Sequence, residues 1–399
     1  MNSAPAGKPD WSWRNAGPDF IRSEVTGGAV LLLAALLAIF WVNAPFGESY
    51  EAFWTTELTL PIPFDGKTET LRYWVNDLLM VFFFFVVGLE IKREIAVGEL
   101  GEGRKARLPL IAAFGGVLLP AAIFLLLNAG EGTARGWAIP MATDIAFAVG
   151  VLALLGKRIP PGVRLLLLSI AIVDDVIAIV VIALFYSGGL QLDWLIAAIG
   201  TVGVILLMQR FGVSRIWPYW IVGAVLWVTV LSSGVHATIA GVILGLLAPA
   251  KPIDGRHVIE ELEHRLHPWT SLVIVPVFAL ANAGIFLGGG VFTDALGSPL
   301  FWGVALGLVL GKSLGISGAI FLASRLGLAK LPDGVESGHV WGIAALGGIG
   351  FTVSIFITGL AFSSIALLEY AKIGIFAASV TAAVIGSVFL LLRTRPGAR

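Results

Sequence analysis

The sequence predicts an all-α polytopic membrane protein with about twelve transmembrane helices. Its residues are 57% hydrophobic and only 13% charged, whereas soluble domains carry about 25% charged residues. The mean hydropathy is +0.92. Apolar runs recur along the whole chain, and many approach the roughly 20 residues that a helix needs to cross a bilayer.

Composition also excludes several classes of partner and site. The 26 basic and 26 acidic residues cancel, so net charge indicates no nucleic-acid partner. The chain has no cysteine, which excludes disulfides, thiolate metal sites and cysteine nucleophiles. No feature of the chain predicts a cofactor. The lipid bilayer is the first partner that we expect.

The chain divides into a short polar segment and one long apolar domain. Residues 1–24 are polar and contain proline, and we interpret them as a cytoplasmic N-terminal segment. The apolar run from Val25 to Val42 follows without a short hydrophobic region and cleavage site, so it predicts a first spanning helix and not a removed signal peptide. Residues 25–395 are expected to form a single transmembrane domain.

The spans and their orientation follow from apolar runs and from the placement of basic residues. Runs bounded by charges, Gly and Pro predict spans centred near residues 33, 83, 118, 146, 175, 202, 224, 242, 278, 312, 351 and 380. The N-terminus, the connections after even-numbered spans and the C-terminus hold 21 of the 26 Lys and Arg residues. Basic residues stay in the cytoplasm, so both termini are predicted to be cytoplasmic.

The first external connection differs from the others. Residues 55–74, "TTELTLPIPFDGKTETLRYW", alternate Thr with apolar residues around Asp65-Gly66 and predict a β-hairpin. An irregular loop is the alternative. A hairpin alone is marginally stable in water, so we expect it to pair with something, and a second copy of this chain is the predicted partner.

Two spans are poor continuous helices. Residues 137–155 contain Pro140 and Asp144, and residues 340–362 contain three glycines at their middle. These are the fourth and eleventh spans, the middle members of spans 3–5 and 10–12. Corresponding interrupted helices indicate inverted-topology repeats that cross at a midplane binding site. For the glycines alone, close helix packing is the alternative.

The fifth span carries two adjacent acids where a charge is most costly. The apolar run 165–185 is 21 residues long and has Asp174 and Asp175 at its midpoint. One Asp at a helix centre costs about 2.5 to 3.5 kcal/mol on insertion scales. Asp144 and Lys312 also lie near the middle of their runs. Because only mutual pairing, water or a cation makes such charges tolerable, the four predict one shared site.

The residue types at this site predict exchange of protons for cations. Adjacent helix positions are about 100° apart, so we expect one acid of the pair to face Lys312 and the other to face water or an ion. Close carboxylates titrate as a coupled set. Carboxylate and hydroxyl oxygens suit a hard cation. We therefore predict exchange chemistry at Asp174, Asp175 and Lys312, with cation ligands from Asp175, Asp174, Asp144 and Thr143.

A second group of ionisable residues is predicted at the cytoplasmic face. Glu90, Arg93 and Glu94 share one helix face at the inner end of the second span. The inner connection 256–269 adds Glu263, His264 and His267, and histidine titrates near neutrality. These residues predict a proton-sensitive cluster, with solvated ion pairs as the alternative.

Two further residues lie near the outer face. Asp77 is near the outer end of the second span, where capping or snorkelling is the alternative to a function. His236 opens the eighth span. We include it among the pH-response candidates, with a packing role as an equal alternative.

Motifs along nearly the whole chain resemble one family. They are "GLEIKRE", "MATDIAFAVGVLALLGKR", "LSIAIVDDVIAI", "SGVHATIAGV", "LEHRLHPW", "LANAG", "GKSLGI" and "GIGFTVSIFI". In this order, from about residue 20 to 395, the chain resembles the bacterial NhaA-type sodium/proton antiporters. That family is itself a reference example of inverted repeats with broken helices, so the agreement with the interrupted spans is not independent.

The resemblance implies a role for each candidate residue. Asp175 is implied to be the main cation and proton carboxylate, with Asp174 its neighbour in contact with Lys312. Asp144 is implied to balance the ends of the interrupted helices. A pH-responsive cytoplasmic region and dimerisation through the hairpin are also implied, the former formed by Glu90, Arg93, Glu94, Glu263 and His264.

Our leading hypothesis is a secondary antiporter that expels Na⁺ or Li⁺ in exchange for entering protons, and not an enzyme. A sodium-coupled solute symporter is an alternative that would need a larger polar pocket. An intramembrane aspartyl protease also needs two membrane acids. Its acids should face each other from separate helices, however, and here they are adjacent with a lysine companion.

Overall fold

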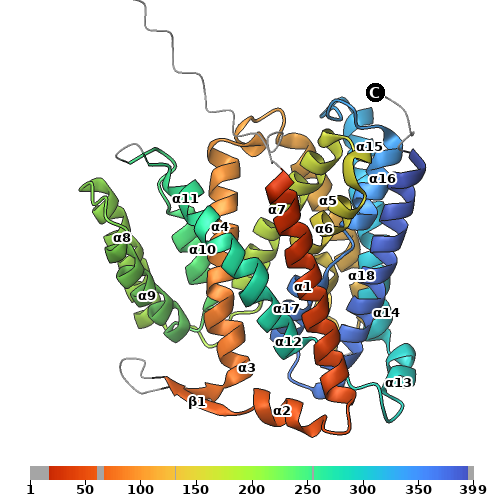
Figure 1. The fold of residues 1–399 in the computed structure, drawn as a ribbon, viewed down its shortest axis with the longest axis horizontal. Helices are drawn as coiled ribbons and strands as arrows, with labels where there is room; N and C mark the ends of the chain where they lie inside the picture. Colours follow the sequence, from red (N-terminus) through yellow and green to blue (C-terminus); the bar gives the residue numbers. More distant parts are fainter. Residues whose placement is uncertain (1–17, 61–66, 131, 254–255, 394–399) are drawn as a thin grey trace, which may run out of the picture.

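A computed structural model of the protein describes residues 18–60, 67–130, 132–253 and 256–393. It is almost entirely helical, with the helices packed side by side into a bundle (Figure 1). Within the described residues, 8 helices are long and apolar enough to cross a membrane, or up to 9 when one bent pair is counted. The predicted polytopic membrane fold is therefore confirmed.

The first six predicted spans all appear as long helical segments. The second is a continuous run of three labelled pieces, because a π-helical turn, η2, joins α3 to α4. The elements of this half are α1 Pro18–Asn43, α2 Glu48–Trp54, α3 Leu71–Trp74, η2 Val75–Leu79, α4 Met80–Ala96, η3 Glu99–Gly101, α5 Arg107–Asn128, η4 Ala134–Met141, α6 Ile145–Leu154, η5 Gly156–Arg158, α7 Pro161–Phe185 and α8 Leu192–Arg210.

The second half contains shorter pieces. Its elements are α9 Trp217–Ser232, α10 Thr238–Leu246, α11 Val258–Trp269, η6 Thr270–Ile274, α12 Val275–Asn282, α13 Val291–Gly297, α14 Pro299–Leu306, η7 Gly307–Gly311, α15 Lys312–Arg325, α16 Ser337–Leu346, α17 Phe351–Ala361 and α18 Ile365–Arg393. The seventh, eighth and ninth predicted centres fall on α9, α10 and α12. Helices α9 and α10 have 16 and 9 residues, so each is shorter than the roughly 20 residues of a full crossing. Helix α12 is the last part of a continuous helical run through α11 and the π-helical turn η6, and this run forms the ninth span.

The predicted hairpin is present but shorter than expected. Strands β1 Glu57–Leu60 and β2 Lys67–Thr70 pair antiparallel. Residues 71–74 are not strand as predicted. They form helix α3, because the Thr70 hydroxyl accepts a hydrogen bond from the Tyr73 N–H at 3.2 Å and so caps the helix. The predicted Asp65-Gly66 turn lies outside the described residues.

The two predicted interruptions are present and meet each other. The fourth span is a 3₁₀-helix, η4, that unwinds at residues 142–144 before α6 begins. The eleventh span bends by 45° between α16 and α17. The Asp144 N–H donates to the Ile349 carbonyl at 2.6 Å, and the Ser354 hydroxyl donates to the Ile139 carbonyl at 2.8 Å. Non-helical backbone at membrane depth is tolerated only where protein covers it, and here each break covers the other.

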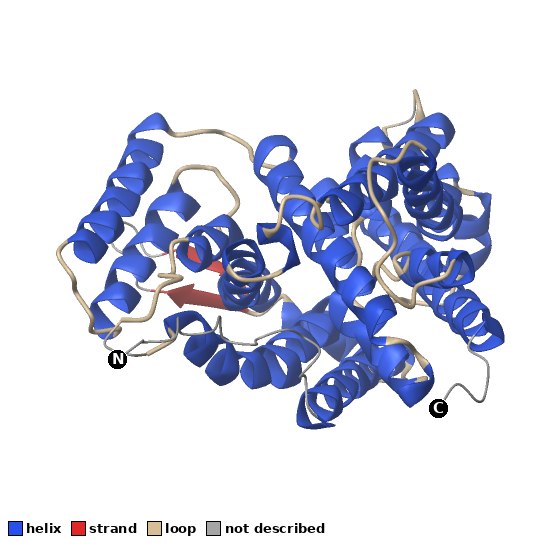
Figure 2. Ribbon diagram, turned by 90° about the horizontal axis from the view of Figure 1, so that it is seen from above, coloured by secondary structure: helices blue, strands red, loops and turns tan. Residues whose placement is uncertain are grey.

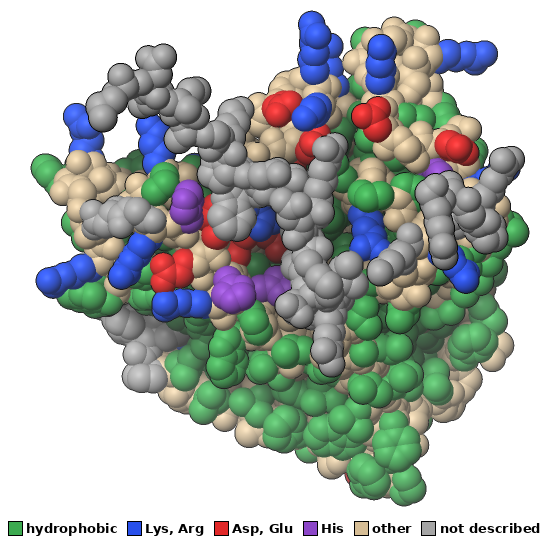
Figure 3. Space-filling view, turned by 45° about the horizontal axis from the view of Figure 1, so that its top comes forward, with side chains coloured by type: hydrophobic (Ala, Val, Ile, Leu, Met, Phe, Trp, Pro, Cys, Tyr) green, Lys and Arg blue, Asp and Glu red, His purple; other side chains and the backbone are tan. Residues whose placement is uncertain are grey.

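The surface has two distinct ends and an apolar belt. Lys and Arg side chains gather at the end of the molecule that is uppermost in Figure 1, above a broad hydrophobic belt (Figure 3). Large apolar side chains such as Leu33, Ile196 and Trp217 are exposed at 64%, 66% and 60%. The hairpin lies at the opposite end (Figure 1) and, seen from above, beneath the left half of the bundle (Figure 2). This distribution fits a bilayer that surrounds the belt.

Candidate functional site

The acid pair on α7 lies beside the two helix breaks and is almost completely buried. Asp174 and Asp175 are 1% and 7% exposed, and Lys312 is fully buried. The Lys312 ammonium donates a hydrogen bond to Oδ2 of Asp174. The Thr143 hydroxyl donates to the same oxygen at 2.6 Å. Lys312 therefore faces Asp174, and the expected contact with one acid of the pair is present.

Asp175 has different surroundings. No hydrogen bond or ion pair to its carboxylate is found within the part of the chain that the structure describes. Oδ1 of Asp174 is also buried without a hydrogen-bond partner. A buried carboxylate oxygen without a partner is costly, so these oxygens are suited to hold a proton or a small cation. The described residues contain no group of three or more His, Cys, Asp or Glu that could hold a metal ion, so a bound cation would also need water or main-chain oxygens.

Asp144 connects the two interrupted spans, and both of its carboxylate oxygens accept hydrogen bonds. Its Oδ1 accepts from the Phe147 N–H at 3.0 Å at the start of α6. Its Oδ2 accepts from the Thr352 N–H at 3.0 Å and from the Thr352 hydroxyl at 2.6 Å at the start of α17. One carboxylate therefore faces two helix N-termini, whose partial positive charges favour an anion. This geometry supports the charge-balancing role over that of a cation ligand.

Thr143 has one hydroxyl proton and two acceptors, Asp174 and the Gly347 carbonyl, the latter at 2.8 Å. It therefore ties the eleventh span to the acid pair. Sequence reasoning missed Thr352 and Ser354, which hold the breaks together. Their signal was the presence of hydroxyl side chains inside the apolar motif "GFTVSIFI".

The predicted cytoplasmic cluster is partly assembled. Arg93 on α4 forms an ion pair with Glu263 on α11. Glu90 interacts electrostatically with both Glu263 and Asp175, so acids extend from this end toward the midplane. Burial raises the pKa of Glu263 to about 8, and the nearby Arg93 offsets this only in part.

Two residues of that predicted group behave differently. Glu94 is 2% exposed and accepts a hydrogen bond from the Glu99 N–H at 2.8 Å, so it also holds the turn after α4. His264 is exposed on α11, because it is one helix position beyond Glu263 and points away from α4. His264 therefore lies outside the buried contact between Arg93 and Glu263.

His236 and Asp77 meet at the opposite end of the molecule. The His236 Nε2 lies 3.8 Å from Oδ1 of Asp77. Both line a cavity of about 390 Å³ whose wall also includes Tyr73, Asn76 and Phe356. The His236 and Phe356 rings are in edge contact, with centroids 5.2 Å apart. His236 therefore does not join the Glu263 group, and the two residues that the sequence treated separately form a pair.

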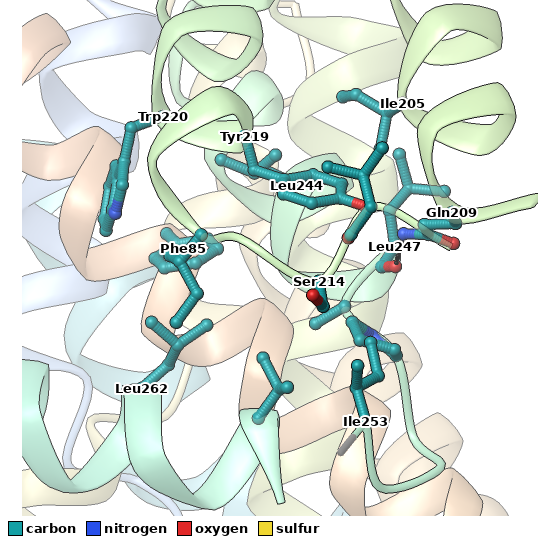
Figure 4. A pocket seen from close by; sticks show the side chains of 15 residues that line it. Phe85, Ile205, Gln209, Ser214, Tyr219, Trp220, Leu244, Leu247, Ile253 and Leu262 are labelled. Carbon is teal, nitrogen blue, oxygen red and sulfur yellow. Dashed lines mark hydrogen bonds between the residues drawn. The ribbon is translucent and has the colours of Figure 1, made fainter. Parts of the chain in front are cut away.

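A second hollow lies between α4, α8, α9, α10 and α11 (Figure 4). Its volume is about 70 Å³, and its lining includes Phe85, Tyr219 and Trp220. No Asp, Glu, Lys, Arg or His lines it. Its lining therefore offers no charged side chain to an ion.

The arrangement of crossed helix breaks around buried acids agrees with what comparison with known proteins finds. A family model described as Na⁺/H⁺ antiporter 1 matches residues 18–390. The chain belongs to this antiporter family. The family consists of transporters, which separates the chain from intramembrane proteases.

Curated members of the family are similar over nearly their whole length. Na(+)/H(+) antiporter NhaA 1 of Erythrobacter litoralis is 48% identical over 375 residues, which is 93% of this chain and 92% of the relative. Na(+)/H(+) antiporter NhaA of Yersinia enterocolitica is 48% identical over 376 residues, which is 94% of this chain and 96% of the relative.

A solved structure shares the fold of this antiporter chain. The sodium proton antiporter MjNhaP1 from Methanocaldococcus jannaschii superposes with a TM-score of 0.56, covering 94% of this chain and 98% of that one. The two sequences are 15% identical, so this likeness concerns the fold alone.

Proposed function

We propose that the protein is a secondary antiporter of a bacterial inner membrane that expels Na⁺ or Li⁺ in exchange for entering protons. The observation that carries the proposal is the unequal state of the acid pair. Asp174 is held by Lys312 and Thr143, while Asp175, its immediate neighbour, has no partner in the described chain. In such a site, one carboxylate is already hydrogen-bonded to protein groups and the other can bind a proton or a cation. Protons and the cation then compete for the same oxygens.

Each residue has a separate task in this proposal. Asp175 and the free Oδ1 of Asp174 bind the transported cation, since both are hard oxygen donors. Lys312 compensates the charge of Asp174 in the dry interior. Asp144 and Thr143 hold the two helix breaks at the correct distance from the pair.

The cytoplasmic residues set the pH at which exchange occurs. Glu263 is the strongest candidate, because its pKa of about 8 lies close to cytoplasmic pH. The Arg93–Glu263 ion pair joins α4 to α11, and Glu90 connects that pair electrostatically with Asp175. Glu94 contributes through the turn that it holds. We assign no such role to His264, and His236 would respond at the opposite face.

We further propose that both termini are cytoplasmic and that residues 25–395 form a single transmembrane domain after an N-terminal segment, residues 1–24. The gathering of Lys and Arg at one end supports this orientation (Figure 3). The hairpin would then be external and would mediate a homodimer. Its support is the exposed two-stranded sheet, since a strand edge is a template for pairing with another chain.

The decisive experiment uses purified protein in vesicles with an acidic interior and a fluorescent pH probe. Addition of outside Na⁺ or Li⁺ should raise the internal pH, whereas K⁺ tests the ion ranking. The Asp175→Asn variant in matched vesicles is the control. No pH response to any of the three cations would contradict antiport, and a response only in the presence of an added organic solute would favour a symporter.

A further inference from the structure

The outer end of the ninth span continues into a strap, residues 283–288, which runs without regular structure to α13. This strap connects α12 to the last three spans, α14–α15, α16–α17 and α18. It lies at the end of the molecule that carries the hairpin, where α2, α12 and α13 meet (Figure 1). Its contacts come from two sides.

On one side, residues of α1, α2 and α3 form short hydrogen bonds with the strap and with the end of α12. The Asn43 side chain donates to the Ile285 carbonyl at 2.7 Å and accepts from the Leu287 N–H at 2.8 Å. The Tyr50 hydroxyl donates to the Leu280 carbonyl at 2.9 Å. Arg72 donates to the Ala281 carbonyl at 3.0 Å. Side chains of α1, α2 and α3 thus satisfy carbonyls that the end of α12 leaves open.

The other side holds the strap through α18. The Glu369 carboxylate accepts from the Phe286 N–H at 3.4 Å, and the Lys372 ammonium donates to the Gly284 carbonyl at 3.4 Å. Ile285 is 3% exposed and packs with Phe301 and Ile373. These hydrogen bonds are at the long limit for such contacts, and apolar packing has no directional requirement. The α18 side is therefore the side on which the strap can slide.

The charges around the strap are balanced across the two sides. Arg72 donates to the Glu51 carboxylate at 3.0 Å on the α2–α3 side. Lys372 interacts electrostatically with Arg72, Glu51 and Glu369. Lys372 is thus within electrostatic range of the Arg72–Glu51 ion pair on the one side and of Glu369 on its own helix. A relative movement of the two sides would separate Lys372 from that ion pair.

We propose that the strap is a latch that keeps the outer side of the transporter closed. Its hydrogen bonds with Glu369 and Lys372 are the contacts that break when the outer side opens. The inference rests on the proposed function, because alternating access requires spans 10–12 to move against α12. Phe356 lines the cavity at this end and lies one helical turn from Thr352. Opening would break the two long contacts of α18 and leave the Asn43, Tyr50 and Arg72 contacts intact.

The absence of cysteine makes a direct test possible. A Val353→Cys reporter places a single thiol at a position on α17 that is only 5% exposed and lies three residues before Phe356. Intact cells are treated with a membrane-impermeant maleimide, and the labelling rate is measured. Lys372→Met or Glu369→Gln in this background should raise the rate roughly threefold to tenfold, the effect of losing one ordinary hydrogen bond on a two-state equilibrium.

Three controls make the result interpretable. Lys67→Met removes a lysine of the same end whose ion pair is with Glu69 in the hairpin, and it should not change the rate. Lys372→Arg keeps the charge and should restore slow labelling. Thr59→Cys in β1 should be labelled at once if the hairpin is external.

Equal or slower labelling in both Lys372→Met and Glu369→Gln would overturn the latch. This readout requires no Na⁺, so it is separate from the test of antiport. If vesicles show no cation-dependent proton movement while the latch variants still increase labelling, the proposed function fails and the latch remains. If exchange is normal and labelling is unchanged, only the latch fails.

Discussion

Asp174 and Asp175 are adjacent in the sequence, yet their surroundings differ because successive helix positions point about 100° apart. Asp174 contacts Lys312 at the start of α15 and Thr143 in the unwound segment between η4 and α6. Asp175 turns away from both and is 7% exposed. At the residue scale, the chemistry therefore depends on a difference in direction between two identical side chains.

Asp175→Asn should abolish Na⁺-driven proton movement while the protein remains folded. The change keeps the shape of the side chain but removes its charge and its proton. Exchange is measured in vesicles, and folding is measured by thermal unfolding in detergent. Asp193→Asn at the exposed start of α8 is the matched control and should be neutral. Near-normal exchange by the Asp175→Asn variant would remove this residue from the mechanism.

Lys312→Ala should lower stability far more than Lys330→Ala. The first change leaves the buried Asp174 carboxylate without its cation, and breaking a buried ion pair in this way costs about 3–5 kcal/mol. Lys330 is exposed, so its loss should have little effect. Thermal unfolding of the two variants gives the comparison. Equal, small effects would show that the Lys312 charge is not needed in the interior.

Glu263→Gln should move the pH dependence of exchange by about one unit or more, without a large change in the maximal rate. Burial raises the pKa of Glu263 to about 8, so the folded protein binds a proton that the unfolded chain has already lost above its ordinary carboxyl pKa. This group therefore stabilises the folded state less as the pH rises from about 5 to 8. The glutamine side chain of the Glu263→Gln variant cannot ionise, so the stability of this variant should not show that decrease between about pH 5 and pH 8.

Two measurements check this prediction, namely initial exchange rates and thermal unfolding, each recorded from pH 5 to 9. Glu261→Gln is a suitable control, since Glu261 is on the same helix and pairs with Arg265 at 2.6 Å near the surface. Identical pH profiles of the wild-type protein and the Glu263→Gln variant would reduce the Arg93–Glu263 pair to a structural contact.

At the scale of single elements, each of the two interrupted spans provides hydrogen-bond partners for the unwound backbone of the other. Unwound backbone at membrane depth exposes polar groups, and each unsatisfied group costs about 1–3 kcal/mol. Asp144 satisfies the starts of both α6 and α17, and Ser354 and Thr143 satisfy carbonyls of the opposite span. Neither break would be stable alone, so the two elements form and move as a unit.

Gly348→Ala should disrupt this unit. A Cβ at residue 348 would overlap the main-chain oxygen of Leu308 in η7. This oxygen is a backbone atom, so it cannot move aside as the end of a flexible side chain could. We expect a clear loss of thermal stability and of exchange. Gly318→Ala is the control, because no atom lies within 4 Å of its added Cβ and alanine favours a helix interior. Equal stability of the two variants would show that the break tolerates expansion.

At the scale of the whole molecule, exchange should move net charge. In one state the acids hold protons, and in the other they hold one cation. If Asp175 and a coupled group, either Asp174 or Lys312, both lose protons when the cation binds, more than one proton enters for each Na⁺ that leaves. Each elementary charge is worth about 2.3 kcal/mol per 100 mV, so the membrane potential would drive Na⁺ expulsion.

This prediction is checked on a solid-supported membrane, where transient currents are recorded under Na⁺ gradients at several pH values. The apparent Na⁺ affinity should weaken as the pH falls, because protons and Na⁺ compete for the same oxygens. Absence of any current would exclude unequal exchange. An affinity that does not depend on pH would exclude competition at the acid pair.

The sequence by itself determined the properties that depend on local composition and periodicity. The apolar runs determined the membrane fold, and the Pro and Gly residues located the two interruptions. The cost of charge in an apolar run identified Asp144, Asp174, Asp175 and Lys312.

Only the tertiary structure decided which acid meets Lys312, because that depends on how α7 is rotated against α15. The same long-range packing engages Asp144 with Thr352, places His236 beside Asp77 and leaves His264 exposed. The Lys312–Asp174 and Asp144–Thr352 hydrogen bonds join residues that are 138 and 208 positions apart, and no local pattern records a contact over such a separation.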